Sequence, residues 1–120
     1  MEIFAPNCEF RRPTIENGQQ RFIGYDAFAP YLEAIIKALK PISGEVLETF
    51  TDGKGKNCTL TQIRGVHSGT FAMPGIKPVP ATDRPVAFEE LTISEVAGGR
   101  IVRQFSYYDL KGLLWQIGAA

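Results

Sequence analysis

The feature that most constrains the fold is a series of strand-like segments that fills the chain from residue 44 to residue 108. Apolar and polar residues alternate in Glu45–Thr51 and in Cys58–His67, which is typical of strands with one face on a core. Two longer strands are expected at Pro85–Val96 and Arg100–Tyr108. The glycines of Ala97–Gly99 allow the positive φ angles of a tight turn between them. The pattern therefore predicts a sheet of antiparallel strands.

A further pair of strands is expected near the start of the chain. Cys8–Arg12 is a short strand-like run that Pro13 closes, and Gln20–Gly24 can return beside it across the turn-forming residues Glu16–Gly18. By contrast, Gly69–Pro80 is rich in proline and glycine and is expected to form a loop.

One amphipathic helix is expected between these two sets of strands, over Asp26–Lys40. Its apolar residues recur every three or four positions and so share one face: Phe28, Tyr31, Leu32, Ile35, Ile36 and Leu39. Asp26 is expected to cap the helix and Pro41 to end it. Pro30 is expected to fall in the first turn, where the amides have no intrahelical acceptor to lose.

A second, shorter helix is expected at the end of the chain, between a capping Asp109 and a terminating Gly118. One long helix, a run of strands and a short helix describe an α+β domain with its helix packed on one face of a curved sheet. At 120 residues and 13.3 kDa the chain can bury one core, so we expect a single domain over residues 1–120.

Composition and charge exclude several classes of protein. Thirteen basic residues balance thirteen acidic ones, so the chain lacks the positive charge of a nucleic-acid-binding or membrane-binding protein. No apolar run approaches the roughly 20 residues that span a bilayer, and no signal peptide is visible. We therefore expect a cytoplasmic protein with neither nucleic acid nor membrane as a partner. Cys8 and Cys58 lie far apart without a metal-binding motif and are expected to be reduced, buried thiols.

Three segments carry a resemblance to a known family. They are Gly65–Ile76 (GVHSGTFAMPGI), Ala81–Val86 (ATDRPV) and Gly99–Gly118 (GRIVRQFSYYDLKGLLWQIG). In order and spacing they resemble the SnoaL-like polyketide cyclase branch of the nuclear transport factor 2-like superfamily, whose members usually read GTHTG, TGRPV, DGKIxEHW and DxxGLLxQLG. Phe4–Phe10 looks like the family's entry into its first strand.

The resemblance implies a cone-shaped fold, in which a strongly curved antiparallel sheet wraps around a long helix and leaves a deep apolar pocket. It also implies a homodimer formed through the outer face of the sheet. Members usually carry one or two helices before the position of Phe4, and here the amino-terminal helix is apparently absent. Either the chain is a fragment, or the pocket is open, or a partner subunit covers it.

The resemblance implies chemistry on a small apolar molecule that bears a carbonyl group. Cyclases of this type abstract a proton next to a carbonyl, using a carboxylate base and hydrogen-bond donors in a dry pocket. The family usually places a histidine and an acidic residue two apart on the last strand, but this chain has Gln104 and Ser106 there. Neither side chain can act as a base near neutral pH.

The role of acid or base therefore falls on other residues, and two candidates stand out. His67 is the single histidine, has a reference pKa of about 6.5 and matches the family's histidine. Its alternative role is structural, with the ring bonded to a backbone carbonyl to hold the next loop. Glu90 shares a strand face with Phe88 and Thr92, and burial there would raise its pKa and improve it as a base. Its alternative is a solvated position on the outer face or rim.

The remaining candidates would bind rather than react. Gln104, Ser106 and Tyr108 share one face of the last strand and are expected to orient the ligand. The wall of the pocket is expected to include Phe28, Tyr31, Leu32, Thr61, Ile63, Met73 and Thr92. Arg11 and Arg12 could together hold an anion, or they could lie on a solvated strand edge.

Two functions of different classes remain open. One is an acid–base enzyme of the cyclase or isomerase type, and the other is a non-catalytic ligand-binding or dimer-forming module that has lost the acid–base pair. Epoxide opening ranks lower, because Arg64 and Asp109 cannot be shown to converge. One histidine and no clustered carboxylates give too few ligands for a metal, so we expect neither metal nor cofactor.

Overall fold

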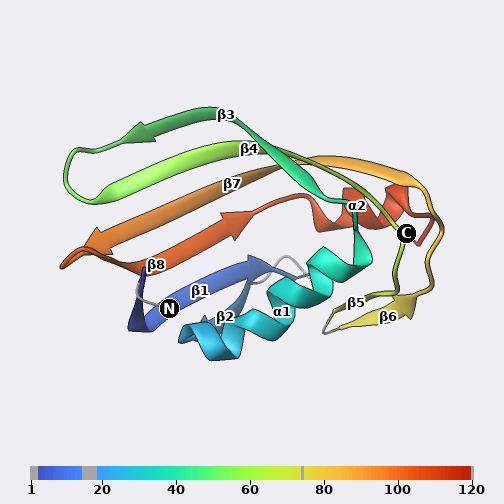
Figure 1. Cartoon of the computed structure of the whole chain (residues 1–120), viewed down its shortest axis with the longest axis horizontal. Coiled ribbons are helices and arrows are strands. Elements are labelled where there is room, and N and C mark those ends of the chain that lie inside the picture. The colour runs from blue at the N-terminus through green and yellow to red at the C-terminus, as the bar shows by residue number, and fades with distance from the viewer. Residues whose placement is uncertain (1–2, 15–18, 74, 120) are drawn as a thin grey trace.

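The computed structural model describes residues 3–14, 19–73 and 75–119 of the chain. These residues form an α+β domain, as expected, and Figure 1 shows the arrangement of its elements. In chain order the elements are β1 (Phe4–Pro13), β2 (Gln19–Ile23), α1 (Tyr25–Ala38), β3 (Ser43–Thr51), β4 (Lys56–Val66), β5 (Phe71–Met73), β6 (Ile76–Val79), β7 (Pro85–Ala97), β8 (Arg100–Tyr107) and α2 (Leu110–Gln116).

The main sheet has six strands in the order β2-β1-β8-β7-β4-β3, and it curves over α1 as the predicted cone requires (Figure 1). Neighbouring strands are antiparallel apart from β1 and β8, which run parallel. The alternation of residues in the sequence does not reveal this pair, because β1 and β8 lie at opposite ends of the chain and no turn joins them.

The predicted hairpins at the two ends of the chain are confirmed. β1 pairs with β2, with Phe10 opposite Phe22, although β1 begins at Phe4, earlier than its apolar alternation suggests. The predicted turn at Glu16–Gly18 lies outside the described residues. Between β7 and β8, Gly98 and Gly99 adopt φ angles of 60° and 78°, as a tight turn requires.

The segment Gly69–Pro80, expected to be a loop, instead contains a second, two-stranded sheet of β5 and β6. Phe71 and Met73 are buried while Ala72 between them is exposed. This alternation covers three residues only, and the surrounding prolines and glycines conceal it in the sequence.

Helix α1 forms where the apolar periodicity predicts it, but its first turn differs from the prediction. The residue before it is Gly24, whose φ is 85°, and no side chain caps the helix. Asp26 lies inside the first turn instead of preceding it. Pro30 lies in the second turn, so the helix loses one internal hydrogen bond at an exposed position.

Two separate clusters hold the ends of α1. Its amino-terminal half packs on an aromatic cluster in which Phe28 stacks on Phe10 with centroids 4.3 Å apart. Its carboxyl-terminal end, Ala38 and Leu39, is buried in a cluster with residues of β5, β7 and α2. The middle of α1 is thereby carried across the concave face of the sheet.

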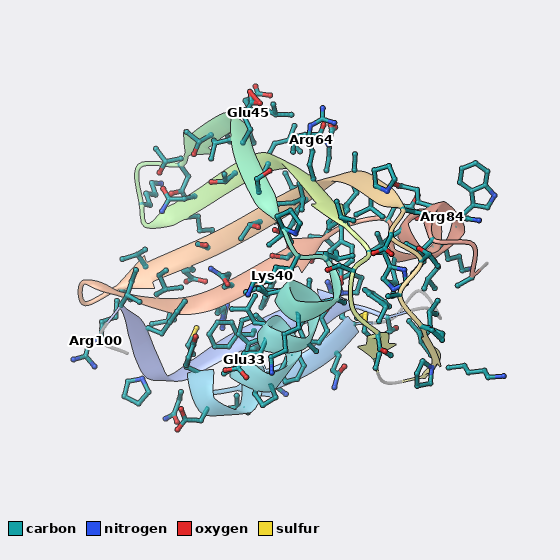
Figure 2. The ribbon with its side chains drawn as sticks, turned by 45° about the vertical axis from the view of Figure 1, so that its right-hand side comes forward. Glu33, Lys40, Glu45, Arg64, Arg84 and Arg100 are labelled. Carbon is teal, nitrogen blue, oxygen red and sulfur yellow. The ribbon has the colours of Figure 1, made fainter. Side chains whose placement is uncertain are left out.

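Helix α2 closes the second cluster through Leu110, Leu113 and Leu114. As predicted, the Asp109 carboxylate caps this helix, and it accepts a hydrogen bond from the Gly112 N–H at 2.8 Å. Figure 2 shows the charged side chains of Glu45, Arg64, Arg84 and Arg100 at the periphery of the molecule.

The two cysteines are free, as predicted, but only one is fully buried. Cys8 lies in the aromatic cluster of β1, whereas Cys58 on β4 is half-buried.

The two aspartates at the helix starts provide a matched test of capping. We expect Asp109→Ala to lower the free energy of unfolding by about 1 kcal/mol, because it removes the side-chain cap of α2. Asp26→Ala should change it by no more than about 0.5 kcal/mol, because Asp26 makes no cap hydrogen bond. Urea denaturation followed by circular dichroism measures both, and equal losses would contradict the assignment of the caps.

Candidate functional site

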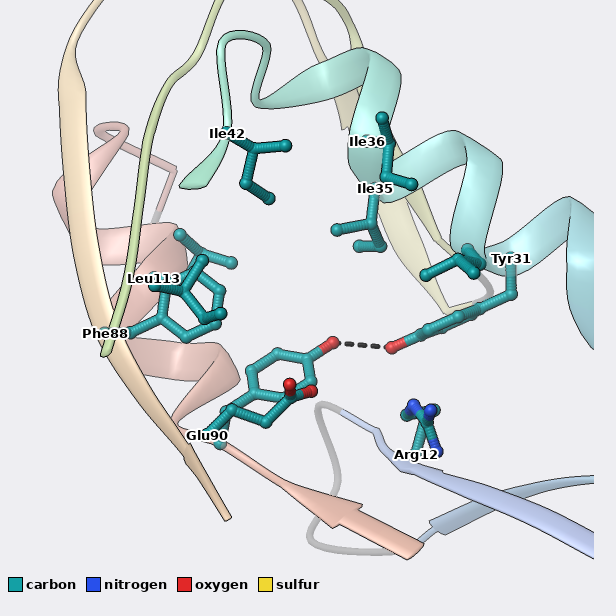
Figure 3. A pocket seen from close by; sticks show the side chains of 11 residues that line it. Arg12, Tyr31, Ile35, Ile36, Ile42, Phe88, Glu90 and Leu113 are labelled. Carbon is teal, nitrogen blue, oxygen red and sulfur yellow. Dashed lines mark hydrogen bonds between the residues drawn. The ribbon is translucent and has the colours of Figure 1, made fainter. Parts of the chain in front are cut away.

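A cavity of about 180 Å³ lies under the middle of α1, against the inner face of the sheet. Figure 3 shows the side chains that line it. They come from β1, α1, β4, β7, the segment before β3, the residue after β8, and α2: Arg12, Tyr31, Leu32, Ile35, Ile36, Ile42, Ile63, Phe88, Glu90, Tyr108 and Leu113.

The wall is apolar apart from four residues. The Tyr31–Tyr108 contact separates the polar end of the cavity, with Arg12 and Glu90, from the apolar end, with Ile36 and Ile42 (Figure 3). The cavity can thus hold an apolar body at one end and polar atoms at the other.

The two tyrosines face each other across the cavity from α1 and the end of β8. Their hydroxyl oxygens are 2.5 Å apart and share one hydrogen bond. Burial raises the pKa of Tyr31 to about 12 and moves the pKa of Tyr108 upward as well, so both hydroxyls keep their protons at neutral pH. Since one proton suffices for the bond between them, the pair retains a second O–H that can donate to a ligand.

Glu90 lies on the inner face of β7 with Phe88, which was one of the two positions that the sequence left open, while Glu89 is exposed. Burial raises the pKa of the Glu90 carboxyl group, and the Arg12 charge and a hydrogen bond with Ser106 partly oppose this rise. Ser106 also bonds to Thr92, with the hydroxyl oxygens 3.0 Å apart. A carboxylate in this environment is a suitable base for a carbon acid.

Arg12 is a second cavity residue whose position the sequence left undecided. The strand alternation of β1 turns Arg12 inward with Phe10, and its side chain is buried. Arg11 points to the opposite face, where it pairs with Glu9 at 2.8 Å and stacks on Phe105. The two arginines therefore cannot hold one anion between them.

Six predicted ligand-contact residues do not line the cavity. Gln104 and Phe28 contact Arg12, through a 2.9 Å hydrogen bond and a ring 4.4 Å from the guanidinium carbon, respectively. Ser106 bonds to Thr92 behind Glu90. Met73 belongs to the cluster of α2.

Two of the predicted ligand-contact residues, Thr61 and Ile63, lie on β4. Ile63 lines the cavity, together with the predicted Tyr31, Leu32 and Tyr108. Thr61 lies opposite Glu90 in the pairing of β4 with β7, on the inner face but outside the cavity lining.

His67, the other candidate base, is buried at the end of β4 and does not line the cavity. Its Nδ1 lies 2.8 Å from the Thr82 hydroxyl oxygen and 3.3 Å from the Thr82 amide, which can donate to it. Its own amide donates to the Arg84 carbonyl. These bonds tie His67 to the segment before β7, and within the described part of the chain no backbone carbonyl bonds to its ring.

The described residues contain no group of three or more histidine, cysteine, aspartate or glutamate side chains placed to hold a metal ion. Within the same residues, no helix is long and apolar enough to cross a membrane.

Comparison with known proteins agrees with the fold. A family model described as SnoaL-like polyketide cyclase matches residues 1–117. No curated protein matches the sequence at a significant level.

Solved structures share the fold at low sequence identity. A SnoaL-like polyketide cyclase candidate from Jannaschia sp. CCS1 superposes with a TM-score of 0.82 at 16% identity, covering 99% of this chain and 76% of that one. IdmH, a polyketide cyclase candidate from Streptomyces antibioticus, has a TM-score of 0.72 at 23% identity, covering 98% and 83%. TsrD from Streptomyces laurentii has a TM-score of 0.74 at 18% identity, covering 98% and 78%.

The raised pKa of Glu90 predicts a pH-dependent cost to stability. A carboxyl group whose pKa is higher in the folded state than in the unfolded state favours folding when protonated. Stability should therefore fall as the pH rises from 4.5, the ordinary pKa of this carboxyl group, through its higher pKa in the folded state. We expect Glu90→Gln to raise the melting temperature at pH 8 and to lose this advantage toward pH 4.

Glu89→Gln, on the outer face of the same strand, is the matched control and should show no such pH-dependent gain. Melting curves recorded between pH 4 and pH 8 test the pair. A Glu90→Gln advantage that is the same at every pH would contradict the burial of an ionised Glu90.

Proposed function

The chain belongs to the SnoaL-like polyketide cyclase family, and we propose that its cavity binds a small apolar molecule with a carbonyl group and removes a proton next to that carbonyl. The observation that carries this proposal is the presence of a half-buried carboxylate, Glu90, and a hydroxyl donor pair in one apolar cavity. Carbon acids need both groups, a base for the proton and a donor for the oxygen that becomes negative.

In the proposed reaction, Glu90 takes the proton from the carbon next to the carbonyl. The electron pair of the broken C–H bond moves into the carbonyl group, whose oxygen becomes an enolate oxygen. A hydroxyl of the Tyr31–Tyr108 pair donates a hydrogen bond to that oxygen. Return of the proton gives exchange or isomerisation, and attack of the enolate carbon on a second carbonyl closes a ring.

The dimensions of the cavity set the size of the substrate. A volume of about 180 Å³ is below the roughly 300 to 1,000 Å³ of typical ligand pockets, which favours compounds with one ring. Glu90 lines this space and His67 does not, so the proposal assigns the role of base to Glu90.

A second candidate function is ligand binding without catalysis. It is favoured by Gln104 and Ser106, which replace the usual histidine and acidic residue of the family and which bond to Arg12 and Thr92 in the described structure.

Exchange of hydrogen for deuterium separates the two candidates. We expect the protein to accelerate deuterium uptake at the methylene carbon of phenylacetone in D₂O, followed by proton NMR. Glu90→Gln should lower this rate about a hundredfold or more, because it removes the base. Glu89→Gln, on the other face of β7, should leave the rate unchanged. Binding of phenylacetone without exchange in the unaltered protein would assign the cavity to ligand binding alone.

We also propose that the protein forms a homodimer through the outer face of the main sheet. This face carries a row of partly exposed apolar side chains, Leu91, Ile93 and Phe105, the last of which lies against the Arg11 guanidinium group. Tyr107 of the same face is 42% exposed.

Sedimentation tests the proposed dimer. We expect twice the chain mass of 13.3 kDa at micromolar concentration, and a shift to the single-chain mass in Ile93→Glu, which places a charge in the apolar row. Glu33→Lys, a charge change on the exposed side of α1, should leave the dimer intact. A single-chain mass for the unaltered protein would contradict the proposal.

A further inference from the structure

Arg12 is a buried cation that forms no ion pair with a carboxylate among the described residues. Its residue exposure is 7%, the lowest of any charged side chain described. The ion pairs of the described residues join Glu9 to Arg11 and Arg21, and Glu95 to Arg103, all on the outer face of the sheet. Glu90 of the same cavity offsets part of this charge without forming an ion pair, so an anion within hydrogen-bond distance of Arg12 would stabilise the buried charge further.

The hydrogen bonds of Arg12 use one edge of its guanidinium group. Nη1 donates to the carbonyl oxygens of Arg11 and Gln104 at 2.9 and 3.2 Å, and Nη2 donates to the Gln104 side chain at 2.9 Å. Nε and the second hydrogen of Nη2 have no acceptor among the described residues. These two N–H groups form the other edge of the fork, which matches the two oxygens of a carboxylate.

The position of this fork is fixed before any ligand arrives. The ring of Phe28 lies against the guanidinium group at 4.4 Å, and that ring is itself stacked on Phe10. Together with the bonds to Gln104, these contacts hold the side chain in place, so little entropy is lost when it binds an anion.

The surroundings of Arg12 favour an anion with an apolar body. Arg12 lines the cavity at its polar end, and isoleucines line the opposite end. Glu90 is the single carboxylate of the lining, and it forms no ion pair with Arg12. Because Glu90 does not pair with Arg12, the free edge of the guanidinium group remains available to an anion of the ligand.

We propose that the substrate of this cavity is a compact apolar carboxylic acid, whose carboxylate binds the Nε–Nη2 edge of Arg12. The inference rests on the proposed function, because it takes the same cavity as the substrate site. It adds that the reacting carbonyl belongs to a keto acid, with the acid group toward β1 and the apolar body toward Ile36 and Ile42.

A matched pair of probes tests the proposal. Phenylpyruvate and phenylacetone differ in one group, a carboxylate in place of a methyl group. We expect phenylpyruvate to bind about ten- to a hundredfold more tightly at neutral pH, measured by isothermal titration calorimetry, because charge-assisted hydrogen bonds are worth this much. Equal affinities in the unaltered protein would overturn the proposal.

Variants of the two adjacent arginines localise the effect. Arg12→Gln should abolish the preference for the acid, whereas Arg11→Gln should keep it, because Arg11 points to the outer face. A preference that survives in a folded Arg12→Gln protein would overturn the assignment to Arg12.

Glu90→Gln provides a measurement that does not depend on the folding of an Arg12 variant. Removing the like charge from the cavity should tighten the binding of phenylpyruvate by a larger factor than that of phenylacetone. Weaker binding of phenylpyruvate in this variant would count against an anion at the polar end. These binding results are independent of deuterium exchange, so an acid that binds through Arg12 without exchange refutes the catalytic proposal alone.

Discussion

The cavity exists because α1 is held at its two ends and not along its length. Phe28 fixes the first half of the helix to the aromatic cluster of β1, and Leu39 fixes its end to the cluster of α2. A curved sheet cannot follow a straight helix, so the middle turns of α1 stand away from β4 and β7. Tyr31 crosses this space to bond with Tyr108, and the volume that remains is the site.

The cavity also separates its polar groups from water, and this strengthens the electrostatic interactions between them. In an apolar cavity the charge of Arg12 and the charge of Glu90 influence each other more strongly than they would in solvent. If Glu90 accepts a proton, the cavity loses one negative charge, and an enolate oxygen next to the tyrosines restores it. Proton transfer then moves a negative charge within the site without leaving Arg12 uncompensated, which keeps the electrostatic cost of the step low.

The sequence predicted most of the elements, because they depend on local periodicity. Glu90, Ile63 and Tyr108 line the cavity, although alternation along their strands left open which of the two faces is covered. Arg12 could not be separated from Arg11, because alternation places two adjacent residues on opposite faces but does not say which face is covered. The positions of His67 and Met73 depend on tertiary packing near α2 and the segment before β7, which no local pattern encodes.

The unusual residues of the last strand have a coherent explanation in this structure. Gln104 and Ser106 occupy the positions of the family's usual histidine and acid, and each supports a charged residue on a neighbouring strand: Gln104 bonds to Arg12 of β1, and Ser106 to Glu90 of β7. Thr92 of β7 lies opposite Ser106 of β8. Glu90 lies two residues from Thr92 on the same face of β7, where it lines the cavity. The carboxylate of this cavity therefore comes from β7, the strand next to β8, and β8 contributes side chains that bond to the charged residues of the cavity.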